Sequence, residues 1–503
     1  MAKSIMIQGT MSNAGKSLIA AGLCRIFKQD GYRVAPFKSQ NMALNSYVTS
    51  EGLEMGRAQV VQAMAAGVEP SVRMNPILLK PTTDMGSQVI VQGQVVGNMR
   101  AMDYFAKKKE YIPVIRESYE QLASDHDIIV IEGAGSPAEI NLKQDDIVNM
   151  GMAKIADAPV LLVGDIDRGG VFAQLIGTVM LLEPEEQARI KGLIVNKFRG
   201  DKKILDPGIT MLEERAGKPV LGVVPYADVD IEDEDSLASS LEETHIQAEI
   251  DVAVIRFPRI SNFTDMQALS MERDVSVRYV TKPSDLGEPD VILLPGTKNT
   301  IQDLLWLRES GLEAKITRLA KKGAIVFGIC GGYQMLGEVL MDPMQTESAL
   351  GSVRGMGLLP VTTVFEEEKQ LENRTYHISM PEGTFASLSG KKVAGYEIHM
   401  GRTEAADNDG TLQPFVIGPD GEVLGYTAGT VAGSYIHGIF DEVAFREAFI
   451  NLLYARKGKT RGESEHLSIH EYREQQFDKL AQILRESLDM DRIYEILELR
   501  GLR

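Results

Sequence analysis

The chain has 503 residues, too many for one ordinary hydrophobic core, which predicts roughly two or three domains. Its 44% hydrophobic and 25% charged residues are typical of a globular protein, and neither a repeat nor a low-complexity tract is present. The 71 acidic and 53 basic residues give a net charge of -18, which argues against a nucleic-acid partner because binding a phosphate backbone needs clustered positive charge.

The N-terminus and the cysteines bear on the cellular compartment. Residues 1–7 run directly into a strand-like segment without a long apolar signal region, and no apolar run approaches the roughly 20 residues that span a bilayer. Two cysteines, Cys24 and Cys330, cannot supply a disulfide framework or a Cys-rich metal site. We therefore expect a cytoplasmic protein with no membrane partner.

The first half of the chain alternates strand-like apolar runs with helical patterns. The strands are expected at residues 4–8, 34–37, 128–131, 160–163, 193–196 and 220–223. Nearly continuous apolar strands separated by helices are typical of a parallel sheet covered on both faces. Residues 1–228 are therefore predicted to form a doubly wound α/β domain.

A phosphate-binding loop follows the first expected strand. Gly15 allows backbone N–H groups to close on phosphate oxygens, Lys16 adds positive charge, and Ser17 can hold a magnesium ion at the start of the next helix. Thr10 stands where the first glycine of the usual motif would be, and Gly9 lies one residue too early. This loop predicts a nucleoside triphosphate site.

Acidic residues at strand ends are candidate magnesium ligands. Glu132 ends the strand at 128–131 and should lie beside the phosphate loop, at the carboxyl edge of the sheet. Asp165 and Asp167 also follow a strand, but Gly169 and Gly170 indicate a turn there that would serve the organic substrate instead. We expect Ser17 and Glu132 to hold Mg²⁺, with further ligands left open.

The second half of the chain repeats the α/β pattern. Residues 229–249 are predicted to be an acidic linker, because their charges repel and they lack apolar content. Strands are expected at 252–255, 275–280, 291–294 and 325–328, followed by a β-rich region at 358–436, so residues 250–455 form the second domain. Residues 456–503 are expected to form a helical extension whose amphipathic helices pack on the surface.

Cys330 has the setting of a nucleophile. It follows an apolar strand, lies between small residues, and precedes a helix, so the turn exposes the thiol and offers the N–H of Gly331 to an oxyanion. Gly296, at the end of another strand, is the candidate for a second oxyanion N–H. Cys24, inside an apolar helix, is expected to be core.

A cysteine nucleophile needs a base. His437, in the turn at residues 433–438, has the best context of the seven histidines, and His399 is second. The pair Cys330 and His437 resembles the nucleophile and base of class I glutamine amidotransferases, which release ammonia from glutamine through a thioester. Most members carry a glutamate two residues after the histidine, where this chain has Ile439. The resemblance therefore leaves two alternatives open, a Cys-His dyad or another group that orients His437.

The phosphate loop resembles that of dethiobiotin synthetase, and the two halves together resemble the cobyric acid synthase family of vitamin B12 biosynthesis. The resemblance runs from about residue 3 to residue 455 and leaves out only the helical tail. The stretches distinctive of that family are 38–42, 56–59, 74–81, 164–172 and 196–201. The resemblance implies that ATP activates the b, d, e and g carboxylates of adenosylcobyrinic acid a,c-diamide by phosphorylation and that glutamine supplies the nitrogen. It implies that Lys38 steadies the transferred phosphoryl group.

The same resemblance implies that the corrinoid meets polar residues at 38–45 and 75–84. The residues singled out for this contact are Gln40, Asn41, Asn75 and Lys80. The expected partners are thus the corrinoid, glutamine and ATP, while the oligomeric state stays open.

Two other functions compete with this interpretation. The related a,c-diamide synthase shares both halves, but it usually has a Gly-Pro-Asp pattern where this chain has residues 40–42. A nucleotide-switch protein would need the phosphate loop but has no use for Cys330 and His437.

Overall fold

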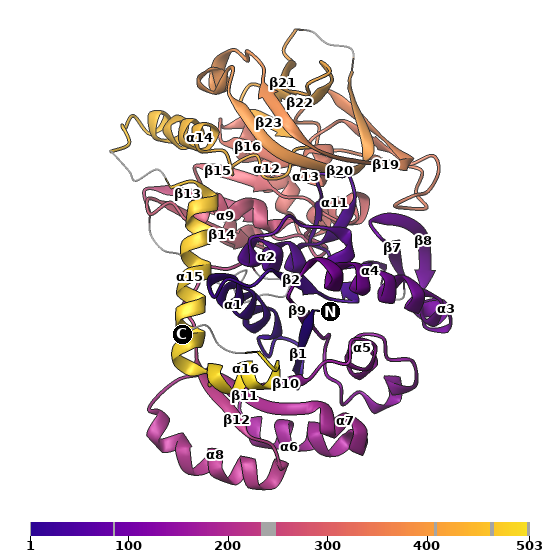
Figure 1. Cartoon of the computed structure of the whole chain (residues 1–503). Coiled ribbons are helices and arrows are strands. Elements are labelled where there is room, and N and C mark those ends of the chain that lie inside the picture. The colour runs from indigo at the N-terminus through magenta and orange to yellow at the C-terminus, as the bar shows by residue number, and fades with distance from the viewer. Residues whose placement is uncertain (1, 84–85, 233–247, 407–409, 463–466, 500–503) are drawn as a thin grey trace. The chain divides into compact units, whose positions relative to one another are not determined.

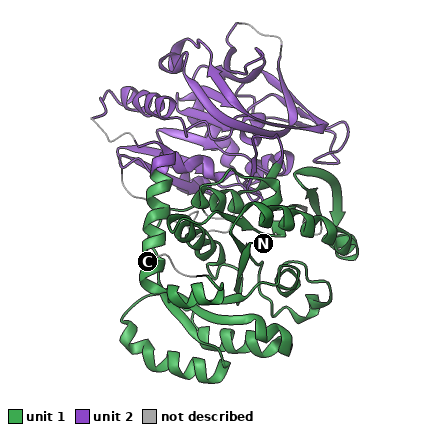
Figure 2. Ribbon diagram, in the orientation of Figure 1, with its two compact units in different colours: residues 1–43, 54–232, 472–503 green, residues 44–53, 233–471 purple. Residues whose placement is uncertain are grey.

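The structure is a computed structural model that describes residues 2–83, 86–232, 248–406, 410–462 and 467–499. The chain forms two compact units. The first consists of residues 1–43, 54–232 and 472–503, and the second of residues 44–53 and 233–471 (Figure 2). Neither unit is continuous in sequence, so the boundaries at 228, 250 and 455 expected from the sequence differ from the folded units.

The first unit is built on a six-stranded parallel sheet with the order β12-β11-β10-β1-β9-β2 (Figure 1). Its strands are β1 (Lys3–Gly9), β2 (Val34–Phe37), β9 (Ile128–Glu132), β10 (Val160–Asp165), β11 (Ile190–Phe198) and β12 (Val220–Pro225). The helices between them are α1 (Lys16–Gln29), α2 (Arg57–Ala66), α4 (Ile112–Asp125), α5 (Met150–Ile155), α6 (Val171–Leu181), α7 (Pro184–Arg189) and α8 (Lys202–Ala216). The predicted α/β class is confirmed, and all six expected strands form.

A smaller sheet in this unit was not expected. It has the order β3-β6-β7-β8, formed by β3 (Gln40–Met42), β6 (Ile77–Thr83), β7 (Gly86–Val91) and β8 (Gln94–Arg100), and α3 (Ala101–Lys107) follows it. Gln92 and Gly93 join β7 to β8 with φ of 46° and 79°. Two consecutive residues in the left-handed region make the tight turn that a hairpin favours.

The C-terminal tail completes the core of the first unit. Helices α15 (Ile469–Ser487) and α16 (Met490–Ile496) are amphipathic, as predicted, and Phe477, Leu480 and Leu484 are buried in the same core cluster as α1. A Cβ atom on Gly22 of α1 would lie 2.3 Å from Leu484 Cδ1, so the two helices pack closely. The tail is therefore part of the first unit's core.

The acidic segment begins differently from the prediction. Val229 and Ile231 pack against the core of the first unit, and the buried Glu232 forms ion pairs with Arg57 at 2.5 Å and Arg473 at 2.6 Å. Burial alone would raise the pKa of Glu232, but Arg473 and Arg57 lower it to about 2. Because these two arginines neutralise the buried carboxylate of Glu232, residues 229–232 fold with the first unit. Residues 233–247 of the predicted linker, and Asp84, lie outside the described residues.

The second unit is built on an eleven-stranded mixed sheet. Its parallel part, in the order β14-β13-β15-β16-β23, comprises β13 (Ile250–Ile255), β14 (Val275–Val280), β15 (Val291–Leu294), β16 (Ile325–Ile329) and β23 (Val431–Ser434). The remainder comprises β17 (Val339–Met341), β18 (Ser352–Arg354), β19 (Val361–Ile378), β20 (Lys392–Ala405), β21 (Gln413–Ile417) and β22 (Val423–Ala428). The principal helices are α11 (Thr300–Glu309), α12 (Leu312–Lys321), α13 (Gly331–Met335) and α14 (Val443–Arg456). All four expected parallel strands and the β-rich region form.

Residues 44–53 belong to the second unit although they lie between elements of the first. They include β4 (Ser46–Val48), and Val48 packs with Tyr396 and Ile398 of β20. Asn45 was expected within the stretch that faces the corrinoid, but it is 1% exposed and bonds to Asn262 instead. Across the described parts of the chain, no helix is long and apolar enough to cross a membrane.

Candidate active sites

The phosphate loop lies between β1 and α1, at the carboxyl edge of the parallel sheet. Gly15 has φ of 97° and begins α1, and a Cβ atom there would lie 2.0 Å from Asn196 Nδ2. Glycine is therefore required by both the backbone angle and the space. Lys16 Nζ donates to Met11 O at 3.0 Å, and Thr10 Oγ1 donates to Gln174 Oε1 at 3.1 Å. These hydrogen bonds fix the loop in a conformation in which the side chain of Lys16 lies against the loop backbone.

Glu132 is the centre of a buried polar network next to this loop. Its Oε1 accepts from Ser17 Oγ at 2.8 Å and from Lys38 Nζ at 3.0 Å. Its Oε2 accepts from Gln62 Nε2 at 2.5 Å and Gln59 Nε2 at 3.4 Å. Glu132 is fully buried, so these donors stabilise a carboxylate that water cannot reach. The structure brings Ser17 and Glu132 together, as the sequence predicted, and adds Lys38, which was singled out separately.

The residues expected to meet the corrinoid are mostly bonded within the protein. Asn75 Nδ2 donates to the carbonyls of Lys38 and Ile77, and its Oδ1 accepts from Gly56 N. Asn41 Nδ2 donates to Gln59 Oε1 at 3.0 Å. These bonds tie the 38–42 and 75–77 stretches to each other and to the network around Glu132.

Two other polar residues of this set lie on the small sheet. Lys80 Nζ forms a buried ion pair with Glu54 Oε1 at 2.8 Å, and Gln40 Oε1 accepts a hydrogen bond from Tyr104. Gln40 is partly exposed, whereas Lys80 is buried. Their contact with substrate remains a prediction.

The aspartates that were ranked lower as magnesium ligands are engaged elsewhere. Asp165 Oδ2 pairs with Lys197 Nζ at 3.0 Å, and its Oδ1 accepts from Asp167 N at 2.8 Å. Asp167 forms an ion pair with Arg199 at 3.0 Å. These partners make Glu132 the better candidate, because it already meets Ser17.

Cys330 lies at a sharp turn between β16 and α13. Its backbone has φ of 50° and ψ of -111°, an unfavourable conformation for a residue with a side chain. The turn is fixed by Cys330 N donating to Ser434 O at 2.8 Å, and by Gly332, where a Cβ atom would lie 2.0 Å from Leu294 O. Gly331 is the first residue of α13, where backbone N–H groups lack partners within the helix. The turn therefore places the thiol beside an N–H donor. Cys330 is buried, at 7% exposed, so the expectation that the turn exposes the thiol is wrong.

His437 is oriented by an aspartate that the sequence did not reveal. Its Nδ1 lies 2.7 Å from Asp265 Oδ2, and Asp265 Oδ1 accepts from Gly438 N at 2.9 Å. Burial alone would lower the pKa of His437, but the Asp265 carboxylate, assisted by the Cys330 side chain, raises it to about 10. A Cβ atom on Gly296 would lie 2.9 Å from His437 Cε1, so this glycine lets the imidazole approach the second candidate oxyanion donor.

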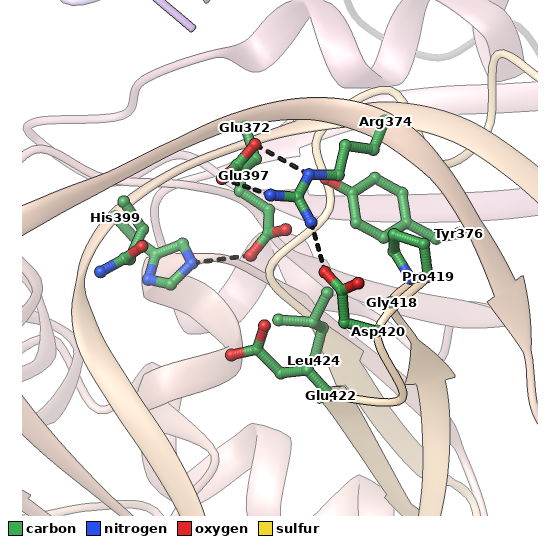
Figure 3. A pocket seen from close by; sticks show the side chains of 11 residues that line it. Glu372, Arg374, Tyr376, Glu397, His399, Gly418, Pro419, Asp420, Glu422 and Leu424 are labelled. Atoms are coloured by element: carbon green, nitrogen blue, oxygen red, sulfur yellow. Dashed lines mark hydrogen bonds and ion pairs between the residues drawn. The ribbon is translucent and has the colours of Figure 1, made fainter.

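The second-choice histidine has a different environment. His399 Nε2 lies 3.1 Å from Glu397 Oε2, its Nδ1 lies 2.8 Å from Gly401 O, and its ring stacks on Tyr435. Figure 3 shows this pair in a pocket lined by residues of β19, β20 and the segment 418–424, where Arg374 bonds to Glu372 and Asp420. Because both ring nitrogens are engaged, His437 is the better base.

Comparison with known proteins identifies both units. Residues 5–237 match the family described as the CobQ/CobB/MinD/ParA nucleotide binding domain, and residues 251–445 match the CobB/CobQ-like glutamine amidotransferase domain. The chain is 58% identical to a cobyric acid synthase of Lachnoclostridium phytofermentans, over 99% of both chains. The chain belongs to the cobyric acid synthase family.

Other members of the family are nearly as similar. The cobyric acid synthases of Ruminiclostridium cellulolyticum and Streptococcus sanguinis are 56% and 52% identical, each over 99% of this chain and 98% and 99% of the relative. Cobyric acid synthases thus align with almost the entire chain. The similarity therefore extends through the C-terminal tail, past residue 455, where the resemblance expected from the sequence ends.

In this member of the family, the residue that sequence reasoning missed is Asp265. It precedes His437 by 172 residues and lies in a short 3-10 helix, Phe263–Met266, outside any recognisable motif. The one available signal was Ile439, because an apolar residue at the usual carboxylate position requires an acid from elsewhere in the chain. Cys24, by contrast, is fully buried in α1, as predicted.

Proposed function

We propose that the protein carries out glutamine- and ATP-dependent amidation in cobalamin biosynthesis, converting the b, d, e and g carboxylates of adenosylcobyrinic acid a,c-diamide to amides and giving cobyric acid. The observation that carries this proposal is the presence, in one chain of this family, of the buried Asp265–His437 pair beside Cys330 together with a phosphate loop. Because glutamine and ATP are the co-substrates, we place the reaction in the cytoplasm.

The glutaminase reaction follows from the second unit. Because the pKa of His437 is raised to about 10, His437 already holds the proton of the Cys330 thiol at neutral pH, and the thiolate attacks the carboxamide carbon of glutamine. The N–H groups of Gly331 and Gly296 stabilise the oxyanion. His437 then protonates the leaving ammonia, and water hydrolyses the thioester to glutamate. Asp265 holds the imidazole in the tautomer with a proton on Nδ1, so that Nε2 accepts the cysteine proton.

Activation of the carboxylate belongs to the first unit. A carboxylate is a poor electrophile until it is phosphorylated, so ATP must be used before ammonia can attack. The backbone from Thr10 to Gly15 would surround the phosphates, and Lys16 would turn from Met11 O toward them. Lys38, which contacts Glu132, would neutralise the transferred phosphoryl group.

The oxygen atoms near the loop fit a magnesium ion. Ser17 Oγ lies 2.8 Å from Oε1 of the buried Glu132, and Mg²⁺ prefers such hard oxygen ligands, with the remainder supplied by phosphate and water. When bound, the ion would neutralise phosphate charge. Ser17 and Glu132 are the residues that would hold it.

The corrinoid would meet the small sheet of the first unit. Gln40 is the partly exposed polar residue of β3, Asn41 follows it on the same strand, and Lys80 lies on the paired strand β6. Asn75 would act indirectly, because its side chain holds the backbone at Lys38 and Gly56.

A mass-spectrometric time course of the purified protein with adenosylcobyrinic acid a,c-diamide, glutamine, ATP and Mg²⁺ tests the whole proposal. Each conversion of an acid to an amide lowers the mass by about one unit, and we expect the series to end after the fourth. Glutamate release that depends on Cys330 without a change in the corrinoid would retain the amidotransferase chemistry and refute the substrate. Conversion of cobyrinic acid to its a,c-diamide would instead identify the related synthase.

A further inference from the structure

Residues 44–53 contact the loop that carries Asp265. Asn45 Oδ1 accepts from Asn262 N at 2.7 Å, and Asn262 Oδ1 accepts from Ser46 N at 3.0 Å. Asn45 and Asn262 are only 1% and 2% exposed, so water cannot replace either bond. We call this reciprocal contact the Asn45–Asn262 pair.

Asn262 sets the position of Asp265. It has φ of 53°, a left-handed conformation that starts the 3-10 helix Phe263–Met266, and its carbonyl accepts from Asp265 N at 3.1 Å. A residue in this unfavourable conformation persists only where its surroundings fix it. The Asn45–Asn262 pair supplies two buried hydrogen bonds at that point. It therefore fixes the turn that aims the carboxylate at His437.

The same segment also contacts the other support of His437. Tyr396 donates its hydroxyl hydrogen bond to Ser46 O at 3.3 Å. Its ring stacks on the His437 ring, with centroids 5.2 Å apart and planes 22° apart. His437 N donates to Tyr396 O at 2.9 Å, and Tyr396 N donates to His437 O at 3.1 Å. Residues 45 and 46 thus bear on both the carboxylate that bonds to His437 and the aromatic ring that covers it.

We propose that Asn45 is a positioning residue of the glutaminase, which acts through Asn262 and Asp265 to hold His437 in register with Cys330. This rests on the glutaminase reaction proposed above. The side chain of Asn45 bonds to Asn262 N in the Asp265 loop, and it comes from a segment separated from the rest of its unit by residues 54–232. Its contribution is geometric, since a displacement of about 1 Å at a catalytic base can cost about 10²-fold in rate.

The test compares Asn45→Ala with Asn373→Ala in the full-length protein. Asn373 Nδ2 donates to Val48 O at 2.8 Å and Tyr47 Oη at 3.1 Å, so its loss also removes hydrogen bonds to residues 44–53 but none to the Asp265 loop. We expect Asn45→Ala to lower kcat for glutamine hydrolysis by about 10²-fold, with little change in KM. Asn373→Ala should stay close to wild type. Ammonia-supported amidation should be unaffected in both.

The pH profile separates positioning from general loosening of the fold. If His437 moves away from Asp265, its pKa falls and the alkaline limb of kcat/KM moves toward neutral pH in Asn45→Ala. A fall in kcat that is equal in the two alanine variants, or an unmoved alkaline limb, would overturn the proposal. Asn45→Asp keeps the acceptor oxygen for Asn262 N and should recover part of the rate.

A second variant keeps the test decisive if Asn45→Ala does not fold. Tyr396→Phe removes only the hydroxyl that reaches Ser46 O and keeps the ring over His437. We expect a several-fold lower kcat with the same direction of pH shift, and an unchanged kcat and pH profile would overturn the proposal. Absence of glutamine hydrolysis in the wild-type protein would refute the proposed glutaminase itself, which distinguishes that failure from this one.

Discussion

Replacing Asp265 by Asn should disable the glutaminase while leaving the rest of the protein intact. Both carboxylate oxygens of Asp265 accept hydrogen bonds, one from His437 Nδ1 and one from Gly438 N, at 2.7 and 2.9 Å. A carboxamide has one acceptor oxygen and one NH₂ group. In the Asn variant, either His437 Nδ1–H or Gly438 N–H must therefore face the NH₂ group, which is itself a donor.

The two orientations of the carboxamide fail in different ways. If its oxygen stays on Gly438 N, its NH₂ group donates to His437 Nδ1, and the imidazole proton moves from Nδ1 to Nε2. Nε2 can then no longer accept the proton of Cys330. If its oxygen turns to His437, the buried Gly438 N–H is left unsatisfied at a cost of about 1–3 kcal/mol. The first orientation gives the wrong tautomer, which in a serine protease triad costs about 10⁴-fold in kcat. We expect a loss of about 10³–10⁴-fold in kcat for glutamine hydrolysis.

The assay measures glutamate release from glutamine and, separately, corrinoid amidation supported by ammonium chloride. Asp265→Asn should abolish the first and preserve the second. Asp274→Asn is a matched control, because Asp274 bonds to Arg461 and Tyr454 at the amino end of β14, away from the carboxyl edge that carries Cys330. If Asp265→Asn retained glutaminase activity within about tenfold of wild type, Asp265 would not be the residue that orients His437.

Four further outcomes are expected. Cys330→Ala should lower glutamine-dependent amidation by at least about 10³-fold and leave ammonia-supported amidation intact; equal losses would refute separate sites for ammonia release and amidation. Lys16→Ala should lower both by about 10²–10³-fold, and retained synthesis would mean that the loop does not bind the nucleotide. Because the pKa of His437 is raised, its interaction with Asp265 stabilises the fold fully below about pH 6.5, and this stabilisation is lost as the pH rises toward 10. The difference in Tm between wild type and Asp265→Asn should therefore shrink across that range, and a constant difference would contradict this expectation. Leu484→Ala, which opens a cavity against Gly22, should cost about 2–5 kcal/mol in urea unfolding without altering glutaminase kcat, and an unchanged midpoint would place α15 outside the core.

Continuous apolar runs explain why the parallel strands could be predicted. β2 and β15 begin and end where the sequence analysis put them, because buried parallel strands carry apolar side chains on both faces. β14 also has its predicted bounds, although Ser276 and Arg278 interrupt its apolar pattern. The sheet of β3, β6, β7 and β8 escaped prediction because its strands are short or polar and β8 is largely exposed. Its tight turn at Gln92 and Gly93 also lacks the commonest residues for such a turn.

Some residues of the candidate site can be predicted from a short stretch of sequence, whereas others depend on contacts between residues far apart in the chain. Lys16, Ser17, Cys330 and Gly331 owe their positions to a strand, a turn and a helix that follow one another in sequence, so a short window is enough to find them. Asp265 depends instead on which loop the fold brings to His437. No spacing in the chain records that choice, and an isolated acidic residue in an irregular segment gives no periodic signal.

The same argument explains why the domain boundaries were hard to read. Composition marks a linker where charges accumulate, but it does not show which core a short segment joins. Residues 44–53 belong to the second unit because they form hydrogen bonds with Asn262, Tyr396 and Asn373. Glu232 is likewise assigned by Arg57 and Arg473 rather than by its acidic neighbours. Dividing the chain at residues 228 and 250 would therefore remove Asn45 from the second unit and α15 from the first. For that reason the separation of glutaminase from synthase activity has to be tested with substitutions in the full-length protein rather than with isolated halves.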